Sequence, residues 1–262
     1  MFRYIARDFN TALHRRYTYA YVIGIFVLCL ISNIAVVAFR MVYGTNEGTY
    51  AYNIINYTTW CFVVPYYSCI FISDMGFGKT YPNPQIKDKI TRNMSRTAIY
   101  FSKLITELLL GLLFMVIAFV LLIGITTIFH LADGTVRVND IRDFVDKMLI
   151  AIPLWCAGIS FGNMFLFIYK DKRKAYMGYF ILTLIVPRLI MALAAEPVSL
   201  AAFKWIRQFL ITQGFSLLPY PADPARNVPL TITVGCIYAL IACVVGVSVY
   251  RKTTVKYYED SI

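Results

Sequence analysis

Few residues in this sequence are of a type and spacing that could do chemistry. The chain has two histidines, His14 and His130, so a histidine-based zinc site is excluded. Gly78-Lys79-Thr80 matches the end of a phosphate-binding loop, but Ser73 stands at the first glycine position of that motif. An apolar run precedes it instead of a strand, so amides would not converge on phosphate. We therefore expect no catalytic residue, no metal site and no cofactor bound by this chain.

Two ionisable residues lie within long apolar runs, Glu107 and Arg188. A charge inside a lipid bilayer costs a few kcal/mol, so such residues normally face a partner or water. One interpretation is that they line a transport path or fix a gate. The other is that Glu107 pairs with Lys103, one helical turn away, while Arg188 reaches the outer interface.

Aromatic residues crowd the second apolar run, among them Tyr57, Trp60 and Tyr66. Such a lining would suit a path for a peptide or an amphipathic molecule. Packing in a core or against a second copy explains the same residues equally well.

The composition indicates the elements that must position these residues. The chain is 59% hydrophobic and only 15% charged, which is too apolar for an ordinary soluble domain. A membrane-spanning helix needs about 20 apolar residues. Six runs meet this need, at residues 17–39, 51–73, 99–129, 148–169, 175–195 and 230–250. We predict an all-α integral membrane protein with a single transmembrane domain over residues 1–262.

The charge pattern predicts the orientation of these spans. The net charge of +11 arises mostly from basic residues before the first span, between spans two and three, between spans four and five, and after the last. Basic residues mark cytoplasmic loops, and these positions alternate as six spans require. We expect a plasma-membrane protein with both termini in the cytoplasm, and no nucleic-acid partner.

Residues 1–16 have the pattern of an amphipathic helix. Phe2, Ile5, Phe9 and Leu13 recur at near-helical spacing among polar residues. Such a helix would lie at the inner membrane interface with its apolar face in the headgroup region. A frayed basic tail that only sets topology is the alternative.

Two outer segments also carry helix signals. Asn139 is placed to cap a short helix with Ile141, Phe144, Val145 and Met148 on one face. Residues 196–229 are long yet apolar, and we expect Gly214 to end a first short helix there. This second segment either dips into the membrane and returns or rests on its outer surface.

The most distinctive stretch is the basic loop between the second and third spans. A helix fits from Gln85, because Pro82 and Pro84 interrupt the chain before it. Ile86, Ile90 and Met94 are spaced by four and form an apolar ridge. Such a ridge with basic flanks suits a groove on a soluble partner. A loop that only sets topology or contacts lipid headgroups explains the charges as well.

This stretch resembles a pattern in bacterial ABC-2 type permeases. The run reads Gln85-Ile-Lys-Asp-Lys-Ile-Thr-Arg-Asn-Met-Ser-Arg-Thr-Ala-Ile-Tyr-Phe-Ser-Lys103. It is similar to T-I-K-N-K-L…G-x-S-R-x-x-I-Y-x-S-K, which follows the second span in that family. The departures are Gln85 where the family often has Thr, Asn93 where it often has Gly, and the Pro82-Asn83-Pro84 entry.

The resemblance implies the membrane subunit of an ABC exporter. Two such subunits, identical or paralogous, would pair with two separate ATPase subunits that carry ATP and Mg. Residues 84–97 would be the coupling helix, and the short outer helices within 196–229 would cap the path. The residues expected to dock the ATPase are Ile86, Lys87, Lys89, Ile90, Arg92, Met94, Ser95 and Arg96. Substrates in this family include peptides, antibiotics and lipid-linked material. A self-sufficient secondary transporter or channel that uses Glu107 or Arg188 is the alternative.

Overall fold

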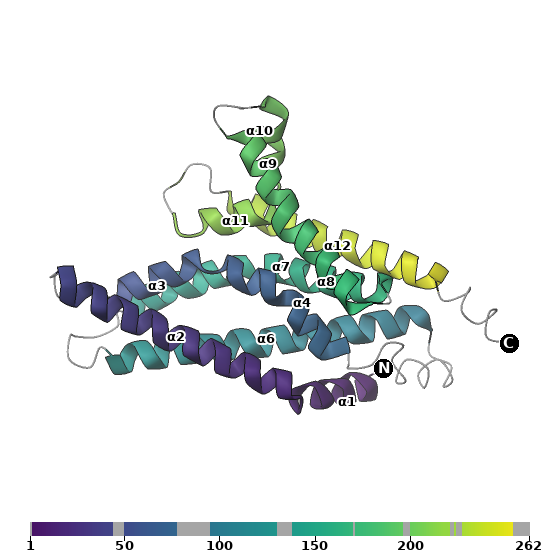
Figure 1. The fold of residues 1–262 in the computed structure, drawn as a ribbon, viewed down its shortest axis with the longest axis horizontal. Coiled ribbons are helices and arrows are strands. Elements are labelled where there is room, and N and C mark those ends of the chain that lie inside the picture. The colour runs from purple at the N-terminus through teal and green to yellow at the C-terminus, as the bar shows by residue number, and fades with distance from the viewer. Residues whose placement is uncertain are drawn as a thin grey trace.

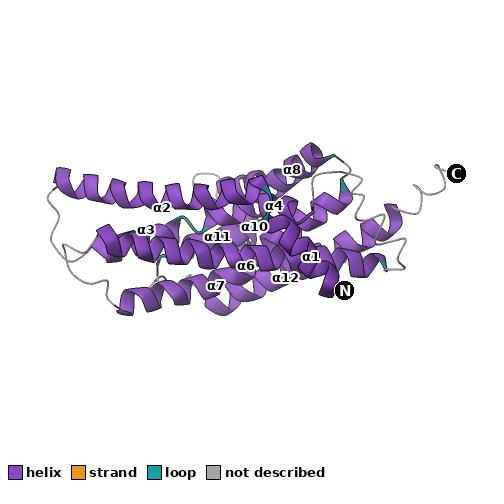
Figure 2. Ribbon diagram, turned by 90° about the horizontal axis from the view of Figure 1, so that it is seen from below, coloured by secondary structure: helices purple, strands orange, loops and turns teal. Residues whose placement is uncertain are grey.

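The chain folds into helices throughout its described part. The computed structural model describes residues 2–43, 50–77, 95–129, 138–169, 171–195, 200–220, 223 and 227–253. No strand occurs in these ranges (Figure 2). The elements are α1 (Phe2–Leu13), α2 (Arg16–Tyr43), α3 (Tyr50–Trp60), α4 (Val63–Phe77), α6 (Arg96–Phe129), α7 (Val138–Ile168), α8 (Lys172–Phe180), the π-helix η1 (Ile181–Ile185), α9 (Val186–Ala194), α10 (Ala201–Arg207), α11 (Ile211–Leu217) and α12 (Val228–Thr253).

The prediction of an all-α membrane protein is confirmed at this level. Among the described residues, five helical stretches are long and apolar enough to cross a bilayer. They are Arg16–Phe39, Arg96–Phe129, Val138–Ile168, Lys172–Ala194 and Val228–Lys252. A sixth pair, Ile54–Trp60 with Val63–Phe77, meets the same criterion only when its two helices are taken together.

The second predicted span is a broken helix instead of the single helix predicted over 51–73. Its two parts meet at a bend of 59° between Trp60 and Val63. Pro65 explains the break, because it has no N–H and its ring clashes with the carbonyl four residues earlier, that of Cys61. The chain therefore leaves the helical path at Cys61 and resumes it at Val63.

The fourth span begins earlier than predicted. The short helix expected at Asn139 and the span expected at 148–169 form one continuous helix, α7. Phe144 of the expected short helix is buried against Phe62, at a ring distance of 5.4 Å. The prediction of two separate helices was wrong, because residues 140–150 contain no signal that ends a helix.

The helix α7 lies at the centre of the bundle. It packs most extensively on α12 and α4. Gly158 and Gly162 allow α7 to approach α4 closely. An added Cβ would come within 2.8 Å of Tyr66 at Gly158 and within 2.5 Å of Ser73 at Gly162. This Gly-x-x-x-Gly spacing is the small-residue pattern that lets membrane helices approach one another.

Both described ends of the chain lie at the same end of the bundle (Figure 1). There α1, the start of α6 and the end of α12 gather, and we name it the α1 end. The helix α1 is present as predicted, but its buried residues are Ile5, Asp8 and Ala12. Phe2, predicted on the apolar face, is 88% exposed. The face of α1 that packs on α6 therefore differs from the predicted apolar face, because it includes Asp8.

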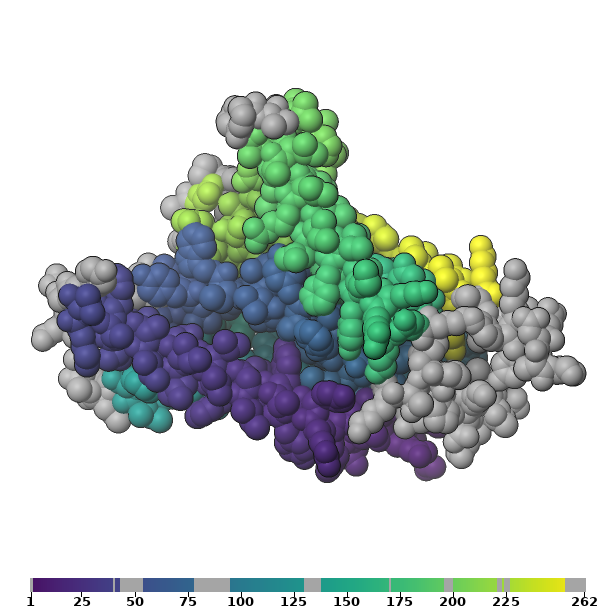
Figure 3. All heavy atoms as spheres, in the orientation of Figure 1, coloured from purple at the N-terminus to yellow at the C-terminus, as the bar shows by residue number. Residues whose placement is uncertain are grey.

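The stretch from α8 to α10 leaves the bundle obliquely. The helix α8 packs on α7, whereas α9 packs mainly on η1 and α10. Figures 1 and 3 show α9 and α10 standing clear of the other helices. Pro187 explains η1, since it disturbs the hydrogen-bond ladder one turn earlier and the Val186 amide bonds to the Ile181 carbonyl, five residues back.

Two short helices occupy the predicted outer segment. The prediction that Gly214 ends the first of them is wrong, because α10 ends at Arg207 and Gly214 lies inside α11. The helix α11 rests on the bundle, with the Phe215 ring 5.6 Å from that of Tyr66. Gly214 allows this contact, since an added Cβ would lie 3.2 Å from Leu154.

Candidate functional site

The last turn of α4 is the point where polar groups from several helices converge. A helix leaves its final four carbonyl groups without partners in the helix. Here Arg15 donates to the carbonyls of Asp74, at 3.4 Å, and Met75, at 2.6 Å. Lys103 Nζ donates to the carbonyl of Gly76 at 3.1 Å. Cations at a helix C-terminus also interact favourably with the helix dipole.

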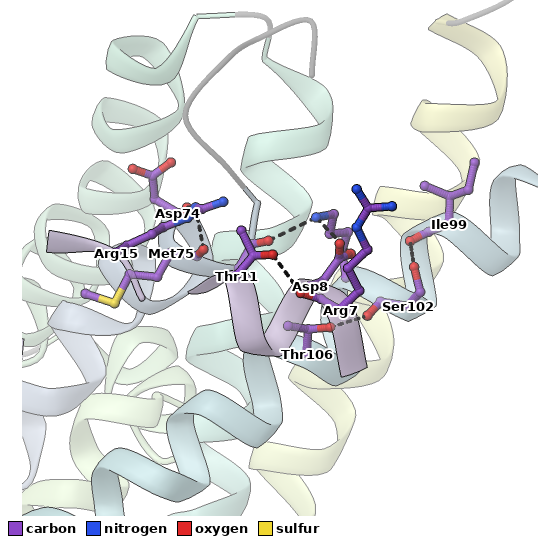
Figure 4. Close-up of polar contacts among 11 residues, drawn as sticks. Arg7, Asp8, Thr11, Arg15, Asp74, Met75, Ile99, Ser102 and Thr106 are labelled. Carbon is purple, nitrogen blue, oxygen red and sulfur yellow. Dashed lines mark hydrogen bonds and ion pairs between the residues drawn. The ribbon is translucent and has the colours of Figure 1, made fainter. Parts of the chain in front are cut away.

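Lys103 also forms a buried ion pair with α1. Its Nζ lies 3.0 Å from Asp8 Oδ2, and the side chains are only 1% and 4% exposed. One lysine therefore holds α1 and α4 against α6 at the same point. Figure 4 shows Asp8, Arg15 and Asp74 gathered at this junction.

Asp74 adds a fourth helix to the junction. Its carboxylate pairs with Lys172 of α8 and accepts a hydrogen bond of 2.9 Å from the Tyr176 hydroxyl. We name Asp8, Arg15, Asp74, Lys103, Lys172 and Tyr176 the α4-end cluster. It ties α1, α4, α6 and α8 together.

Arg15 keeps its charge within this cluster. Burial lowers the pKa of its guanidinium, while the carboxylates of Asp74 and Asp8 act in the opposite sense. An arginine stays protonated in proteins at all ordinary pH values. The cluster is therefore held by a fixed positive charge as well as by lysines.

The helix α6 begins with a side-chain cap. Ser95 lies just outside it, and its Oγ accepts a hydrogen bond of 3.2 Å from the Ala98 amide. This is the N-cap arrangement, which satisfies one of the free amides of the first turn. Arg96 then donates to the carbonyl of Arg251 at 3.1 Å, at the end of α12. The predicted helix over 84–97 is thus corrected at its end, because Ser95 is not helical and Arg96 begins α6.

A comparison with known families assigns the chain to one of them. The model of a family described as "Protein of unknown function (DUF2705)" matches residues 19–255. The chain belongs to the DUF2705 family. No curated protein matches the sequence significantly. The match includes Asp74, Lys103, Lys172 and Tyr176, whereas α1 and Arg15 precede it.

The predicted docking ridge of this DUF2705 chain lies outside the described residues. That holds for Ile86, Lys87, Lys89, Ile90, Arg92 and Met94. Of the predicted docking residues, only Ser95 and Arg96 are described, and both make the contacts given above. The docking role of the whole set stays a prediction.

The residues of the predicted substrate path do not gather at one place. Tyr57 and Trp60 of α3 are 57% and 47% exposed, whereas Tyr66 is a core residue with 2% exposure. The carbonyl of Tyr66 accepts a hydrogen bond of 2.6 Å from the Tyr179 hydroxyl. Trp60 stacks edge-on with Tyr220 at 4.8 Å. The path through these residues stays a prediction.

Glu107 and Arg188 have opposite environments in the DUF2705 chain. Glu107 is completely buried in α6, and Arg188 is an exposed residue of α9 that interacts with Tyr67. Glu107 lies one turn from Lys103, as expected, but the described contacts of Lys103 are with Asp8 and Gly76. The two residues, which one interpretation assigned to a transport path, are thus on helices that do not pack extensively on each other.

Most members of the cluster, Asp8 and Asp74 among them, were not singled out from the sequence. Asp8 falls among the polar residues of the amphipathic pattern, although its spacing from Ile5 and Ala12, by three and four residues, puts it on their face. Asp74 lies three residues before the end of the apolar helix α4. A lone acid on a helix's buried face was the signal that could have revealed each of them.

Proposed function

We propose that this chain is the permease subunit of an ATP-driven ABC exporter. In this proposal two permease subunits pair with two separate ATPase subunits, which bind ATP and Mg. The chain itself has no catalytic residue. It moves a peptide, an antibiotic or an amphipathic lipid-like substrate out of the cell across the plasma membrane. With the bent pair counted as one span, the proposed six spans would leave both termini in the cytoplasm.

The observation that supports this proposal most is the position of the α4-end cluster. The helices α4 and α6 flank the segment proposed to dock the ATPase, and Lys103 joins their ends through the Gly76 carbonyl. Arg15 and Asp8 extend this connection to α1, and Lys172 extends it to α8. A displacement of residues 84–97 by the ATPase would therefore move four helices together.

The mechanism follows from this connection. Closure of the ATPase dimer around ATP draws the docking ridge of Ile86, Ile90 and Met94 toward the centre. Because the α4-end cluster transmits this motion, the spans change between an inward-open and an outward-open arrangement. The short helices α10 and α11 would cap the path at the other end, and α11, dipping in as a re-entrant helix, would close it.

The test is the composition of the complex. The chain is expressed with each ABC ATPase encoded in the same genome, purified in detergent, and weighed by native mass spectrometry. The proposal expects a complex of two permease and two ATPase subunits. Recovery of the chain without any ATPase would contradict it.

One observation favours a second candidate function, a self-sufficient secondary transporter. Glu107 is an acid completely buried in a membrane-spanning helix, and such residues often belong to proton relays. Liposomes that contain only this chain would then show proton-dependent flux of substrate, and Glu107→Gln would abolish it. Flux that requires the ATPase and persists in Glu107→Gln favours the exporter.

A further inference from the structure

The carboxyl group of Glu107 occupies an unusual position. It lies on α6, one turn beyond Lys103, with no part of its side chain exposed. Neither carboxyl oxygen has a hydrogen-bond partner of acceptable geometry among the described residues. The side chain fits because position 76 is glycine, where an added Cβ would lie 2.5 Å from Glu107 Cγ. The close approach of α4 to α6 at this point thus depends on Gly76, which lies opposite Glu107.

The polar groups around Glu107 are engaged elsewhere. Ser73 lies beside the carboxyl, but its hydroxyl donates to the Ile159 carbonyl at 3.2 Å. Lys103 contacts Asp8 and the Gly76 carbonyl. Ser73 and Lys103 are the groups that could stabilise a negative charge at Glu107, but each is bonded to another group in the described arrangement.

The charges that act on Glu107 come from three helices. Lys103 and the phenol Tyr100 lie on its own helix, and Asp74 faces it from α4. Asp8 of α1 acts indirectly, because it shares Lys103. From α7 the neutral amide of Asn163 lies beside Tyr100. The negative charge of Asp74 opposes a second negative charge at Glu107, whereas Lys103 would favour it.

A buried carboxylate without partners costs far more free energy than the neutral acid. The described arrangement is consequently that of a protonated Glu107. When the proton leaves, the O–H bond of the carboxyl breaks and the proton passes to water at the α1 end. The resulting anion then attracts the nearest cation, which is Lys103 at one turn on the same helix.

We propose that Glu107 is a buried proton-binding site whose protonated form keeps Lys103 on Asp8. Loss of the proton draws Lys103 toward Glu107, and the attachment of α1 to the bundle weakens. While Asp8 stays ionised, α1 is held firmly when Glu107 is protonated and is loosened as the pH rises and Glu107 loses its proton. This inference does not depend on the proposed ATPase partner, since it concerns only contacts within the chain.

The test measures the protection of α1 in the full chain in lipid nanodiscs. Hydrogen exchange of the α1 amides is followed over a pH series and compared at each pH with Glu107→Gln, so intrinsic exchange rates cancel. The two proteins should agree at low pH. At high pH the wild-type amides should exchange about tenfold faster, which corresponds to ~1.4 kcal/mol of local stability. The exposed Asp146 at the opposite end supplies the control Asp146→Asn, which should behave as wild type.

Equal exchange of wild type and Glu107→Gln at every pH would overturn the proposal. A second measurement keeps it testable if Glu107→Gln does not fold. Infrared difference spectra of wild-type chain with isotope-labelled glutamate should show the carbonyl band of a protonated glutamic acid that disappears as the pH rises. The absence of such a band at all pH values would equally overturn the proposal.

Discussion

The two ends of the helical stretch Lys172–Ala194 differ sharply in how they are held. At its start, Lys172 and Tyr176 of α8 bind the Asp74 carboxylate within the α4-end cluster. At its far end, α9 and α10 stand clear of the bundle, and α10 has no buried residue. The helix is thus fixed at one end by charge-assisted contacts and left with an open apolar surface at the other.

This difference teaches which part of the molecule can transmit force within one chain. Buried, paired charges specify one geometry, because any other arrangement leaves a charge without its partner. Exposed apolar side chains of α9, such as Leu189 at 58% exposure, specify none within the chain. In the proposed exporter, the α4-end cluster is the fixed junction, and α9 with α10 is available to lipid or to the second permease subunit.

The largest effect is expected from removing the shared cation of the cluster. Lys103→Met takes from Asp8 the cation at 3.0 Å and from the Gly76 carbonyl its donor. Breaking a buried ion pair by removing one partner costs about 3–5 kcal/mol. Thermal unfolding in detergent micelles should show this loss, and Asp8→Asn in the same chain should recover part of it.

The matched control is a lysine at the same end of the bundle. Lys174 of α8 is exposed, so Lys174→Met should change stability by less than about 0.5 kcal/mol. If Lys103→Met were no more destabilising than this control, the buried pair would not be the junction described here.

A medium effect is expected where α4 and α6 touch. In Gly76→Ala the new Cβ would meet Glu107 Cγ at 2.5 Å, so the packing must shift at a cost of about 1–3 kcal/mol. Gly24→Ala is the comparison, because nothing lies within 4 Å of the Cβ position there. In a helix this second change should be neutral or stabilise by up to about 1 kcal/mol. Unfolding temperatures that fall equally in both variants would refute the close contact.

The smallest effect is expected at the far end. Trp205 of α10 is 65% exposed and its ring lies 4.8 Å from that of Phe209. Trp205→Ala should therefore change the unfolding free energy of the single chain by less than about 0.5 kcal/mol. A loss comparable to that of Lys103→Met would show that the two ends do not differ as described.

The membrane class and the positions of the spans could be predicted from the sequence. Long apolar runs are local signals, and the helices at 16–43, 96–129 and 228–253 start and end within a few residues of the runs that predicted them. The break at Cys61 and the π-helix before Pro187 were not predicted. Both arise where a proline removes a backbone donor inside an apolar run, and hydropathy does not respond to that change.

The cluster could be predicted only in part. The pairing of Lys103 with Asp8 joins residues that are far apart in the chain, and Arg15 reaches carbonyl groups sixty residues away. Spacing along one helix does not reveal such contacts, because they depend on how helices cross. Glu107 was recognised as unusual because a charge in an apolar run is visible in the sequence itself.

The most direct test of the central claim is the affinity of the chain for its ATPase. The chain is held in nanodiscs and titrated with each purified ABC ATPase encoded in the same genome. We predict saturable binding by wild type and by Thr91→Asp, which places a charge off the ridge of Ile86, Ile90 and Met94. Ile90→Asp places the same charge on the ridge and should weaken binding by at least about tenfold, or ~1.4 kcal/mol. Absence of binding by wild type, or equal binding by both variants, would contradict the account.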